Sequence, residues 1–192
     1  NSNRNKGMTA ASGDYILFLH DDCLATEGWL KSLLEVFDAF DNVGAVGAKF
    51  VSPQGLLQQA GATLWADGTG TDLGQGQEPS RPEFNYLKDV DYCSGACILF
   101  PRPLLIAIGG FDEGYASAAE ADKDICLAVR AQGLRVIYQP KAEVFHYQST
   151  WPDLPPPNQA AQMLDAGFFA NKWQAELNHM PVRGESPVHG SH

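Results

Sequence analysis

Residues 13–23, GDYILFLHDDC, decide the fold class of this chain. Five successive large apolar residues, Tyr15 to Leu19, predict a buried strand in a covered sheet. The chain becomes acidic where this strand ends, and ligands of open α/β sheets bind beyond the carboxyl ends of the strands. Asp21 and Asp22 repel each other there unless a cation lies beside them. The stretch therefore predicts a divalent metal ion at a sheet edge, in a position that suits phosphate oxygens.

The composition is that of one globular domain with a sizeable core. The chain has 192 residues, of which 44% are hydrophobic and 19% charged. Its formal net charge of -10 argues against nucleic acid or an anionic membrane surface as a partner, because no basic stripe neutralises phosphates. No run of about 18 apolar residues predicts a transmembrane helix. The four cysteines complete no zinc pattern, so we expect reduced thiols in a cytoplasmic protein.

The hydrophobic pattern predicts alternating helices and strands. We expect helices over residues 26–40, 103–108, 118–132 and 159–177, and strands over 15–19, 43–51, 56–64, 90–100, 134–138 and 143–147. Residues 66–82 are rich in Gly, Asp and Pro and predict a long mobile loop that closes over a substrate as a lid. Only a loop and a helical turn over 8–11 precede the first strand, so we expect that an N-terminal part of the domain is missing from this sequence.

A second acidic group lies at the start of the helix expected over 118–132. Asp122 and Asp124 precede the apolar positions of that helix, where they could simply serve the helix dipole and the cap. In the functional alternative, one carboxylate is a general base aimed at an acceptor hydroxyl and the other holds the helix in place. Asp21 and Asp22 have a structural alternative too, a solvated turn in which Asp22 caps the following helix.

Three further signals are weak when each is taken alone. His146 ends a predicted strand as Asp22 does; a lone histidine is more often structural, but beside two carboxylates it is a plausible third metal ligand. Residues 94–96, Ser-Gly-Ala, follow a strand with small side chains that let a ligand approach the backbone amides. Asp112 belongs to a Gly-Gly-Phe-Asp-Glu turn that combines a buried aromatic residue with exposed acids.

Together these motifs resemble an inverting family-2 glycosyltransferase with the GT-A fold, most like bacterial enzymes that build O-antigen, capsule or other surface polysaccharides. The resemblance runs from about Asn3 to His146. Its motifs keep the family's order: N-x-G, A-x-G-D-Y-I-L-F-L-x-D-D, G-W-L, V-G-A-V-G-A-K, D-Y-C-S-G-A, G-G-F-D-E, D-x-D-I-C and Y-Q-P-x-A-x-V-x-H. One such motif is weak evidence, whereas the ordered set is strong.

The resemblance implies a fold and a division into domains. The fold would be an α/β GT-A fold, a mixed sheet flanked by helices, that lacks its first nucleotide-binding strands and their D-x-S/T-x-D uridine motif. Residues 1–150 would be the C-terminal two-thirds of a GT-A catalytic domain, and residues 151–192 a C-terminal helical extension and tail. A fragment of this kind would lack half of its nucleotide pocket and could be inactive alone.

The resemblance also implies roles for single residues. Asp22 and His146 match the family's ligands for Mg or Mn, Asp21 matches a contact to the donor ribose or the metal, and Asp122 matches the presumed base of the E-D-x-D motif. The positions that contact the nucleotide in the family correspond to Asn3, Arg4 and Gly7. The positions near the sugar and the acceptor correspond to Ser94, Gly95, Ala96, Asp112 and Glu120.

Two residues depart from the family's pattern. His20 stands at the first acid of D-x-D, where many relatives also vary. Ala121 stands at the glutamate of E-D-x-D, and Glu120 lies one position earlier. If the family's glutamate helps to bind the acceptor, the acceptor contacts of this chain differ, or Glu120 bends in as a substitute.

The expected function is metal-dependent transfer of a sugar from a nucleotide-diphospho-sugar, of UDP or dTDP type, to a hydroxyl of a saccharide or lipid-linked acceptor. A lipid-linked acceptor would bring the protein to the inner face of the plasma membrane as a peripheral protein. Two alternatives stay open. One is a non-catalytic nucleotide-sugar-binding remnant, which Ala121 and the missing N-terminal part favour. The other is a sugar nucleotidyltransferase, which usually has a basic glycine-rich phosphate loop near the chain start, where only Arg4 and Lys6 stand.

Overall fold

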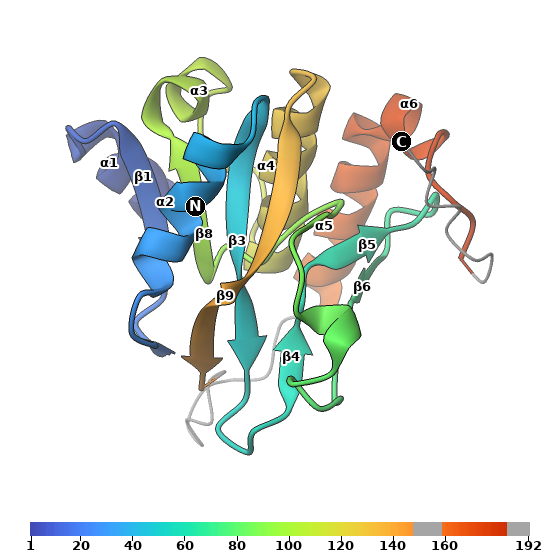
Figure 1. Ribbon diagram of the computed structural model, residues 1–192. Helices are drawn as coiled ribbons and strands as arrows, with labels where there is room; N and C mark the ends of the chain where they lie inside the picture. Colours follow the sequence, from blue (N-terminus) through green and yellow to red (C-terminus); the bar gives the residue numbers. More distant parts are fainter. Residues whose placement is uncertain (148–158, 184–192) are drawn as a thin grey trace.

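The computed structural model describes residues 1–147 and 159–183, which form a mixed β-sheet with helices on both faces (Figure 1). The strands are β1 (Tyr15–Leu19), β2 (Cys23–Ala25), β3 (Val43–Val51), β4 (Leu57–Gln59), β5 (Ala62–Leu64), β6 (Gly70–Asp72), β7 (Lys88–Asp89), β8 (Cys97–Pro101) and β9 (Arg135–His146). The helices are α1 (Ser2–Ala10), α2 (Trp29–Ala39), α3 (Arg102–Ala107), α4 (Ala118–Ala131), α5 (Gln159–Lys172) and α6 (Gln174–Leu177), with a 3-10 turn over Pro82–Phe84. The expected α/β class with a mixed sheet is confirmed.

Strand β3 is the centre of the sheet. The main sheet has the order β1-β8-β3-β9-β2, with β4 beside β3 and β7 beside β9. Strand β3 is parallel to β9 and antiparallel to β8 and β4. All nine of its residues are buried, and two of them are glycines because neighbours come close: a Cβ at Gly44 would meet Val129, and one at Gly47 would meet Cys93. The ends of β1 and β9 therefore belong to the same sheet, β1 through β8 and β9 directly beside β3.

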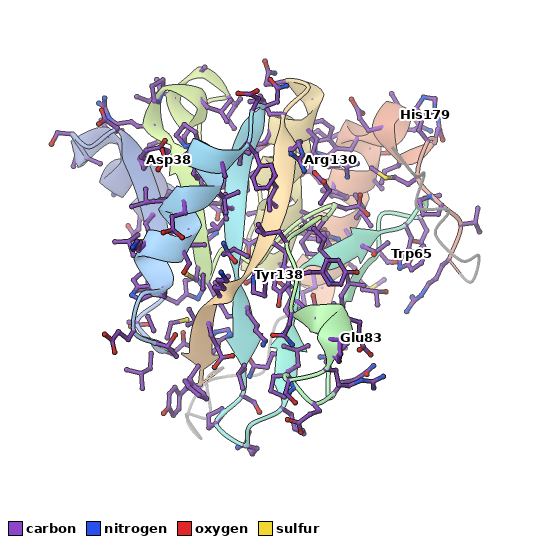
Figure 2. All side chains as sticks on the ribbon, in the orientation of Figure 1. Asp38, Trp65, Glu83, Arg130, Tyr138 and His179 are labelled. Carbon is purple, nitrogen blue, oxygen red and sulfur yellow. The ribbon has the colours of Figure 1, made fainter. Side chains whose placement is uncertain are left out.

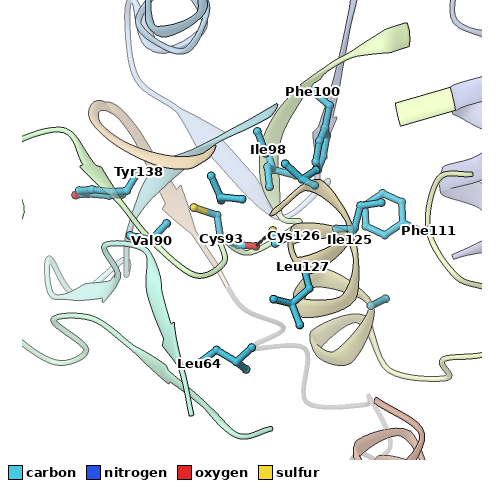
Figure 3. Packing of buried hydrophobic residues seen from close by; sticks show 14 of the residues in the cluster. Leu64, Val90, Cys93, Ile98, Phe100, Phe111, Ile125, Cys126, Leu127 and Tyr138 are labelled. Carbon is cyan, nitrogen blue, oxygen red and sulfur yellow. Dashed lines mark hydrogen bonds between the residues drawn. The ribbon is translucent and has the colours of Figure 1, made fainter. Parts of the chain in front are cut away.

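Each face of the sheet carries its own apolar cluster. Leu33 and Val36 of α2 pack on one face, and Ile125 and Val129 of α4 pack on the other. Figure 3 shows the second cluster, in which the Cys126 thiol donates a weak hydrogen bond to the Cys93 carbonyl oxygen at 3.9 Å. All four cysteines are unpaired, as expected, and three of them are fully buried.

The first strand and the elements beside it differ from expectation. Strand β1 pairs only with β8 among the described strands, so it lies at the sheet edge; Ile16 alone is buried, and the prediction of a wholly buried strand is wrong. An apolar run does not show how many neighbours a strand has. Helix α1 begins at Ser2, well before the predicted turn. Helix α2 begins only at Trp29, because the preceding residues form β2 and Gly28 has a φ of 76°.

Strand β9 is continuous, whereas two strands were expected. It runs through Pro140 because its register on β3 shifts: Ala48 lies opposite Gln139, and Lys49 lies opposite Glu143. The Tyr138 side chain is buried at the centre of the molecule, and its hydroxyl donates to the Phe84 carbonyl oxygen at 2.8 Å (Figure 2). Residues 90–96, also expected as strand, form a connection that leads into β8.

The segment 66–82 contains strand β6 of a hairpin, whereas the sequence predicted a loop without secondary structure. Strand β6 pairs with β5, with Thr71 opposite Thr63. Backbone hydrogen bonds tie the rest of the segment down, from Leu57 N to Gln77 O at 2.8 Å and from Ala60 N to Leu73 O at 2.9 Å. The glycines and aspartates therefore serve turns and this hairpin.

The helices after residue 158 join the main core. Phe169, Trp173 and Leu177 are buried in the same cluster as α4. Residues 151–158 and 184–192 of the expected C-terminal extension lie outside the described residues. Within 1–147 and 159–183, no helix has the length and apolar character to cross a membrane.

Candidate active site

Two strand ends bring Asp22 and His146 together. Strand β2 pairs antiparallel with the end of β9, with Cys23 opposite His146, and Tyr147 N donates to Asp22 O at 2.9 Å. Asp22 Oδ1 lies 3.4 Å from His146 Nε2 and 3.9 Å from His20 Nδ1. One ligand atom from each of these three side chains lies within 4.8 Å of the others. The three residues therefore form a candidate metal centre of two imidazoles and one carboxylate.

The cluster differs from the predicted ligand set in one member. Asp21, predicted as a contact to metal or ribose, is exposed and is not part of the cluster. His20 takes part, although the sequence interpretation treated it only as a departure from D-x-D. The signal was available, because histidine is itself a common metal ligand. Burial lowers the pKa of His146, against the nearby Asp22 charge, and so favours the neutral ring that binds metals.

Asp122 is held in one orientation at the start of α4. The side chain of Ser117 caps this helix by accepting from Glu120 N at 3.4 Å. Asp122 Oδ1 accepts from Arg4 Nη1 at 2.7 Å, and Oδ2 accepts from Gly95 N at 2.7 Å. Burial raises the pKa of Asp122, and Arg4 and the Gly95 amide oppose that rise. The result is a desolvated, oriented carboxyl group.

Arg4 links this carboxylate to His20 of the candidate metal centre. Its Nη2 lies 2.9 Å from His20 Nε2, and its guanidinium stacks 4.7 Å from the centre of the Phe111 ring. Asn5 attaches α1 to the turn that contains Phe111, because its side chain donates to Phe111 O at 2.7 Å and accepts from Phe111 N at 2.9 Å. Asn3 and Gly7, two of the three residues predicted to contact the nucleotide, are exposed on α1 and remain predictions.

A cavity of about 330 Å³ reaches Asp122 and one member of the candidate metal centre. Asp122 and His146 both line it, with Ser94 and Glu120 from the predicted acceptor set. The sequence interpretation missed nine further lining residues, among them Gln58, Gln59, Asp72, Tyr92 and Lys123. No sequence signal singled them out, because β4, the β5–β6 hairpin and α4 meet only in the folded chain.

Hydrogen-bonded polar side chains form one wall of the cavity. Gln59 Nε2 donates to Asp72 Oδ1 at 2.7 Å, and Gln59 Oε1 accepts from Ser94 N at 2.8 Å. Burial raises the pKa of Asp72, against the hydrogen bond from Gln59. Gln58 Nε2 donates to His146 O at 3.0 Å, and its Oε1 has no hydrogen-bond partner within the described residues. Asp72 thus offers a carboxylate to a bound polar molecule, whereas Gln58 Oε1 is buried.

Ala121 and its neighbour Glu120 lie in different surroundings. Ala121, at the family's glutamate position, is fully buried in the core. Glu120 lines the cavity and pairs with Lys123 Nζ at 2.6 Å, while the same nitrogen donates to Gly68 O at 2.8 Å. Lys123 therefore joins the start of α4 to the β5–β6 hairpin.

Other predicted site residues have structural contacts. Asp112 is not among the lining residues; its hydrogen bond with Lys172 Nζ, at 2.8 Å, lowers its pKa. Ala96 is buried, and its carbonyl oxygen accepts from His20 N at 2.9 Å, which fixes the backbone at His20. Gly95 has no room for a side chain, because a Cβ there would meet Asp122. Residues 94–96 thus position both His20 and Asp122.

A mixed sheet flanked by helices is the fold of GT-A glycosyltransferases. Residues 2–162 match the family described as "Glycosyltransferase like family 2", and the chain belongs to this family. It is 30% identical over 180 residues to the O-antigen biosynthesis protein RfbC of Myxococcus xanthus, which covers 91% of this chain and 13% of that protein. It is 33% identical over 149 residues to the pre-mycofactocin glycosyltransferase of Mycobacterium tuberculosis, which covers 77% of this chain and 30% of that protein. The chain thus spans less than a third of either relative.

Solved structures confirm the fold. The crystal structure of GalNAc-T7 with UDP, GalNAc and Mn2+ matches with a TM-score of 0.67 at 15% identity, over 92% of this chain and 36% of that one. The mannosyltransferase PcManGT from Pyrobaculum calidifontis, in complex with GDP-Man and Mn2+, matches with a TM-score of 0.50 at 16% identity, over 96% of this chain and 55% of that one. At these identities the likeness shows the GT-A fold alone.

Proposed function

We propose that the protein transfers a sugar from a nucleotide-diphospho-sugar to a hydroxyl acceptor, with inversion and with the help of a divalent cation, in polysaccharide or glycolipid synthesis. The observation that carries this proposal is that Asp122 and His146 line the same cavity. His146 belongs to the candidate cation site, because its Nε2 lies 3.4 Å from Asp22 Oδ1. A candidate base and one candidate cation ligand therefore open onto the same space. This arrangement suits a reaction in which the acceptor hydroxyl loses its proton and the donor sugar loses a nucleoside diphosphate.

The donor set fits a divalent cation. His20, Asp22 and His146 offer nitrogen and oxygen ligands within 4.8 Å, and Mg2+ and Mn2+ are the ions that the family's pattern implies. When bound, such an ion supplies positive charge that stabilises a diphosphate leaving group. Both solved structures named above contain Mn2+ by title, which supports this part of the proposal.

In this proposal Asp122 acts as the general base. Its two oxygens each accept one hydrogen bond, from Arg4 and Gly95, and each keeps a second acceptor site for an acceptor hydroxyl. The acceptor oxygen attacks the anomeric carbon as its proton passes to Asp122, and the bond from that carbon to the diphosphate oxygen breaks. Attack on the face opposite the diphosphate inverts the anomeric centre. A carboxyl pKa raised by burial improves proton acceptance near neutral pH.

The cavity walls suit a saccharide acceptor. Asp72 and Glu120 line the cavity with carboxylates that can accept from sugar hydroxyls, and Tyr92 adds an aromatic surface. Donors of the UDP or dTDP type and a saccharide or lipid-linked acceptor fit this chemistry. A lipid-linked acceptor would place the protein peripherally at the inner face of the membrane.

Exchange of Asp122 for Asn tests the proposal directly. The amide keeps the shape and one acceptor atom but cannot take up the proton, so release of nucleoside diphosphate in the presence of an acceptor should fall by about 10²–10⁴-fold. Donor binding, measured by calorimetry, should be kept. The matched control is Asp112→Asn, which changes an acid outside the cavity and should leave turnover within about twofold.

The alternatives give different results in the same assay. Pyrophosphate instead of nucleoside diphosphate would indicate a sugar nucleotidyltransferase. Binding of the donor without turnover, in the unsubstituted protein and across a panel of acceptors, would indicate a non-catalytic binding protein. Equal rates for the Asp122→Asn variant and the unsubstituted protein would overturn the role of Asp122.

A further inference from the structure

We propose that Asp72 selects the sugar that enters the cavity, favouring a ring with an amino group and rejecting a ring with a carboxylate. The inference rests on the proposed function in one respect, because that function makes a sugar the ligand of the cavity. Its own basis is the charge of the cavity wall, where Asp72 lacks a cationic partner. It names a class of substrate, which membership of the family does not give.

The other two carboxylates of the cavity each have a cationic partner. Asp122 Oδ1 lies 2.7 Å from Arg4 Nη1, and Glu120 Oε2 lies 2.6 Å from Lys123 Nζ. Among the described residues that line the cavity, Lys123 is the sole lysine or arginine. Its ammonium group also donates to a backbone carbonyl of the β5–β6 hairpin at 2.8 Å and lies 4.6 Å from the centre of the Phe169 ring. The described part of the wall therefore offers no spare cation to an acidic ligand.

Asp72 faces the same cavity with a neutral partner. Gln59 Nε2 donates to its Oδ1 at 2.7 Å, and no ion pair within residues 1–147 and 159–183 includes Asp72. Burial raises the pKa of Asp72, and the hydrogen bond from Gln59 opposes that rise without supplying charge. The ammonium group of an amino sugar would supply it, through a charge-assisted hydrogen bond that is roughly twice as strong as a neutral one. A sugar carboxylate would instead meet a like charge.

Tyr92 extends the acidic surroundings along the wall. Its hydroxyl lies against Gly70, where a Cβ would overlap it. Burial raises the pKa of Tyr92, and the charges of Asp72 and Glu120 raise it further. The hydroxyl therefore stays protonated and lies close to both acids. Tyr92 can serve the neutral oxygens of a sugar ring, but it cannot compensate a negative charge as a cation would.

The proposed cation at the His146 end of the cavity does not reverse this balance. A divalent ion there would be matched by the phosphates of the donor, which are its usual ligands. Burial lowers the pKa of His146, so the ring itself adds no positive charge at neutral pH. The uncompensated charge of the wall therefore remains that of Asp72.

The test measures binding without any turnover. Ligand-observed NMR on the 192-residue chain compares the methyl glycosides of glucosamine, galactosamine, glucose and glucuronic acid, just below neutral pH, where the amino groups are charged. We expect an amino glycoside to bind at least about tenfold more tightly than the glucoside, and the glucuronide more weakly than the glucoside. In Asp72→Asn the preference for the amino glycoside should fall about tenfold, and the glucuronide should bind as well as the glucoside.

The same comparison with nucleotide-sugars shows which sugar uses Asp72. UDP-glucosamine, UDP-glucose and UDP-glucuronic acid are titrated in the presence of MnCl2. A preference for the amino group among the methyl glycosides alone assigns Asp72 to the acceptor, and a preference among the UDP-sugars assigns it to the donor. Either result supports the inference, provided that Asp72→Asn removes the preference.

An exposed acid on the other face of the sheet provides the matched control. Asp38→Asn makes the same chemical change on α2, which packs opposite α4, and should leave every preference unchanged (Figure 2). Equal binding of amino, neutral and acidic sugars in both series would overturn the inference, as would no binding of any amino sugar or a preference that survives in Asp72→Asn. A chain that selects amino sugars through Asp72 but transfers none would overturn the proposed function and leave this inference standing.

Discussion

Asp124 Oδ1 accepts a hydrogen bond from Trp173 Nε1 at 2.7 Å, and this contact joins α4 to the end of α5. The same oxygen accepts from the Tyr115 hydroxyl at 3.0 Å and pairs with Lys172 Nζ at 2.8 Å. The Asp124 side chain is only 4% exposed. Two residues earlier on the same helix, Asp122 faces the cavity. One carboxylate of α4 therefore anchors the helix, and the other is presented to the site.

Loss of the Asp124 contacts should lower the free energy of unfolding. Trp173→Phe keeps the apolar ring but deletes one donor, and should lower the free energy of unfolding by about 1–3 kcal/mol. Asp124→Ala leaves three buried or half-buried partners without their acceptor and should cost about 3–5 kcal/mol. Urea unfolding of the two single variants and the double variant measures both costs and their coupling. The control Asp14→Ala changes an exposed acid; an equal effect of the two alanine variants would contradict the anchor.

Asp72 should destabilise the fold at neutral pH and cease to do so in acid. Burial raises its pKa above that of the unfolded chain, so the ionised carboxylate is disfavoured in the folded state, by about 1.4 kcal/mol for each unit of pKa difference. Asp72→Asn keeps an oxygen for Gln59 and removes the charge. We expect the variant to be more stable than the unsubstituted protein at pH 7.

The difference between the two proteins should vanish below about pH 3.9, the ordinary aspartate pKa, because Asp72 is then protonated in both states. Denaturant unfolding at a series of pH values measures it. A stability difference that stays constant from pH 7 down to this range would show that charge burial is not its cause. If Asp72 also accepts from an acceptor hydroxyl, the variant should raise the KM for acceptor more than it lowers kcat.

Lys123 should be needed mainly to neutralise Glu120. Its ammonium group pairs with Glu120 at 2.6 Å and donates to Gly68 O, and both side chains of the pair are largely buried. Lys123→Met should lower the free energy of unfolding by about 3 kcal/mol or more, because it leaves the carboxylate uncompensated. The double variant with Glu120→Gln should recover part of this loss. Urea unfolding that showed simple additivity would indicate that the two charges are not coupled.

The sequence allowed part of this site to be predicted because some chemistry is local to strand and helix ends. Asp22 and His146 each end an apolar run, and Asp122 begins a helix, so their positions at the sheet edge follow from the pattern. Asp72 could not be found in this way, since it reaches the cavity only through the pairing of β5 with β6. The structural role of Asp112 depends on Lys172, from a helix 60 residues away along the chain.

Burial was the weaker part of the sequence interpretation. Residues 15–19 predicted a buried strand, but an apolar run carries no information on the number of neighbouring strands, and β1 lies at the described sheet edge. The Gly-rich segment 66–82 predicted mobility from its composition alone. Its backbone groups find partners in β4 and β5, which are distant contacts that composition does not report.

Gly95 gives the sharpest test of how Asp122 is positioned. Its backbone N–H donates to Asp122 Oδ2 at 2.7 Å, and a Cβ at this position would overlap the Asp122 carboxylate. Gly95→Ala must therefore push the carboxylate away from its place between Arg4 and the amide. Because a general base contributes about 10²–10⁴-fold to the rate, kcat should fall by at least about tenfold, while the thermal unfolding midpoint changes by only a few degrees.

Gly7→Ala is the matched control for this substitution. A Cβ at Gly7 meets no atom within 4 Å, and the residue lies within α1, so alanine should stabilise the helix by about 0.5–1 kcal/mol. Nucleoside diphosphate release by the Gly7→Ala variant should stay within about twofold if only the helix changes. A raised KM for donor in this variant would instead show that a nucleotide approaches Gly7 closely. Full activity in Gly95→Ala would show that Asp122 works from a different position than the one its hydrogen bonds define.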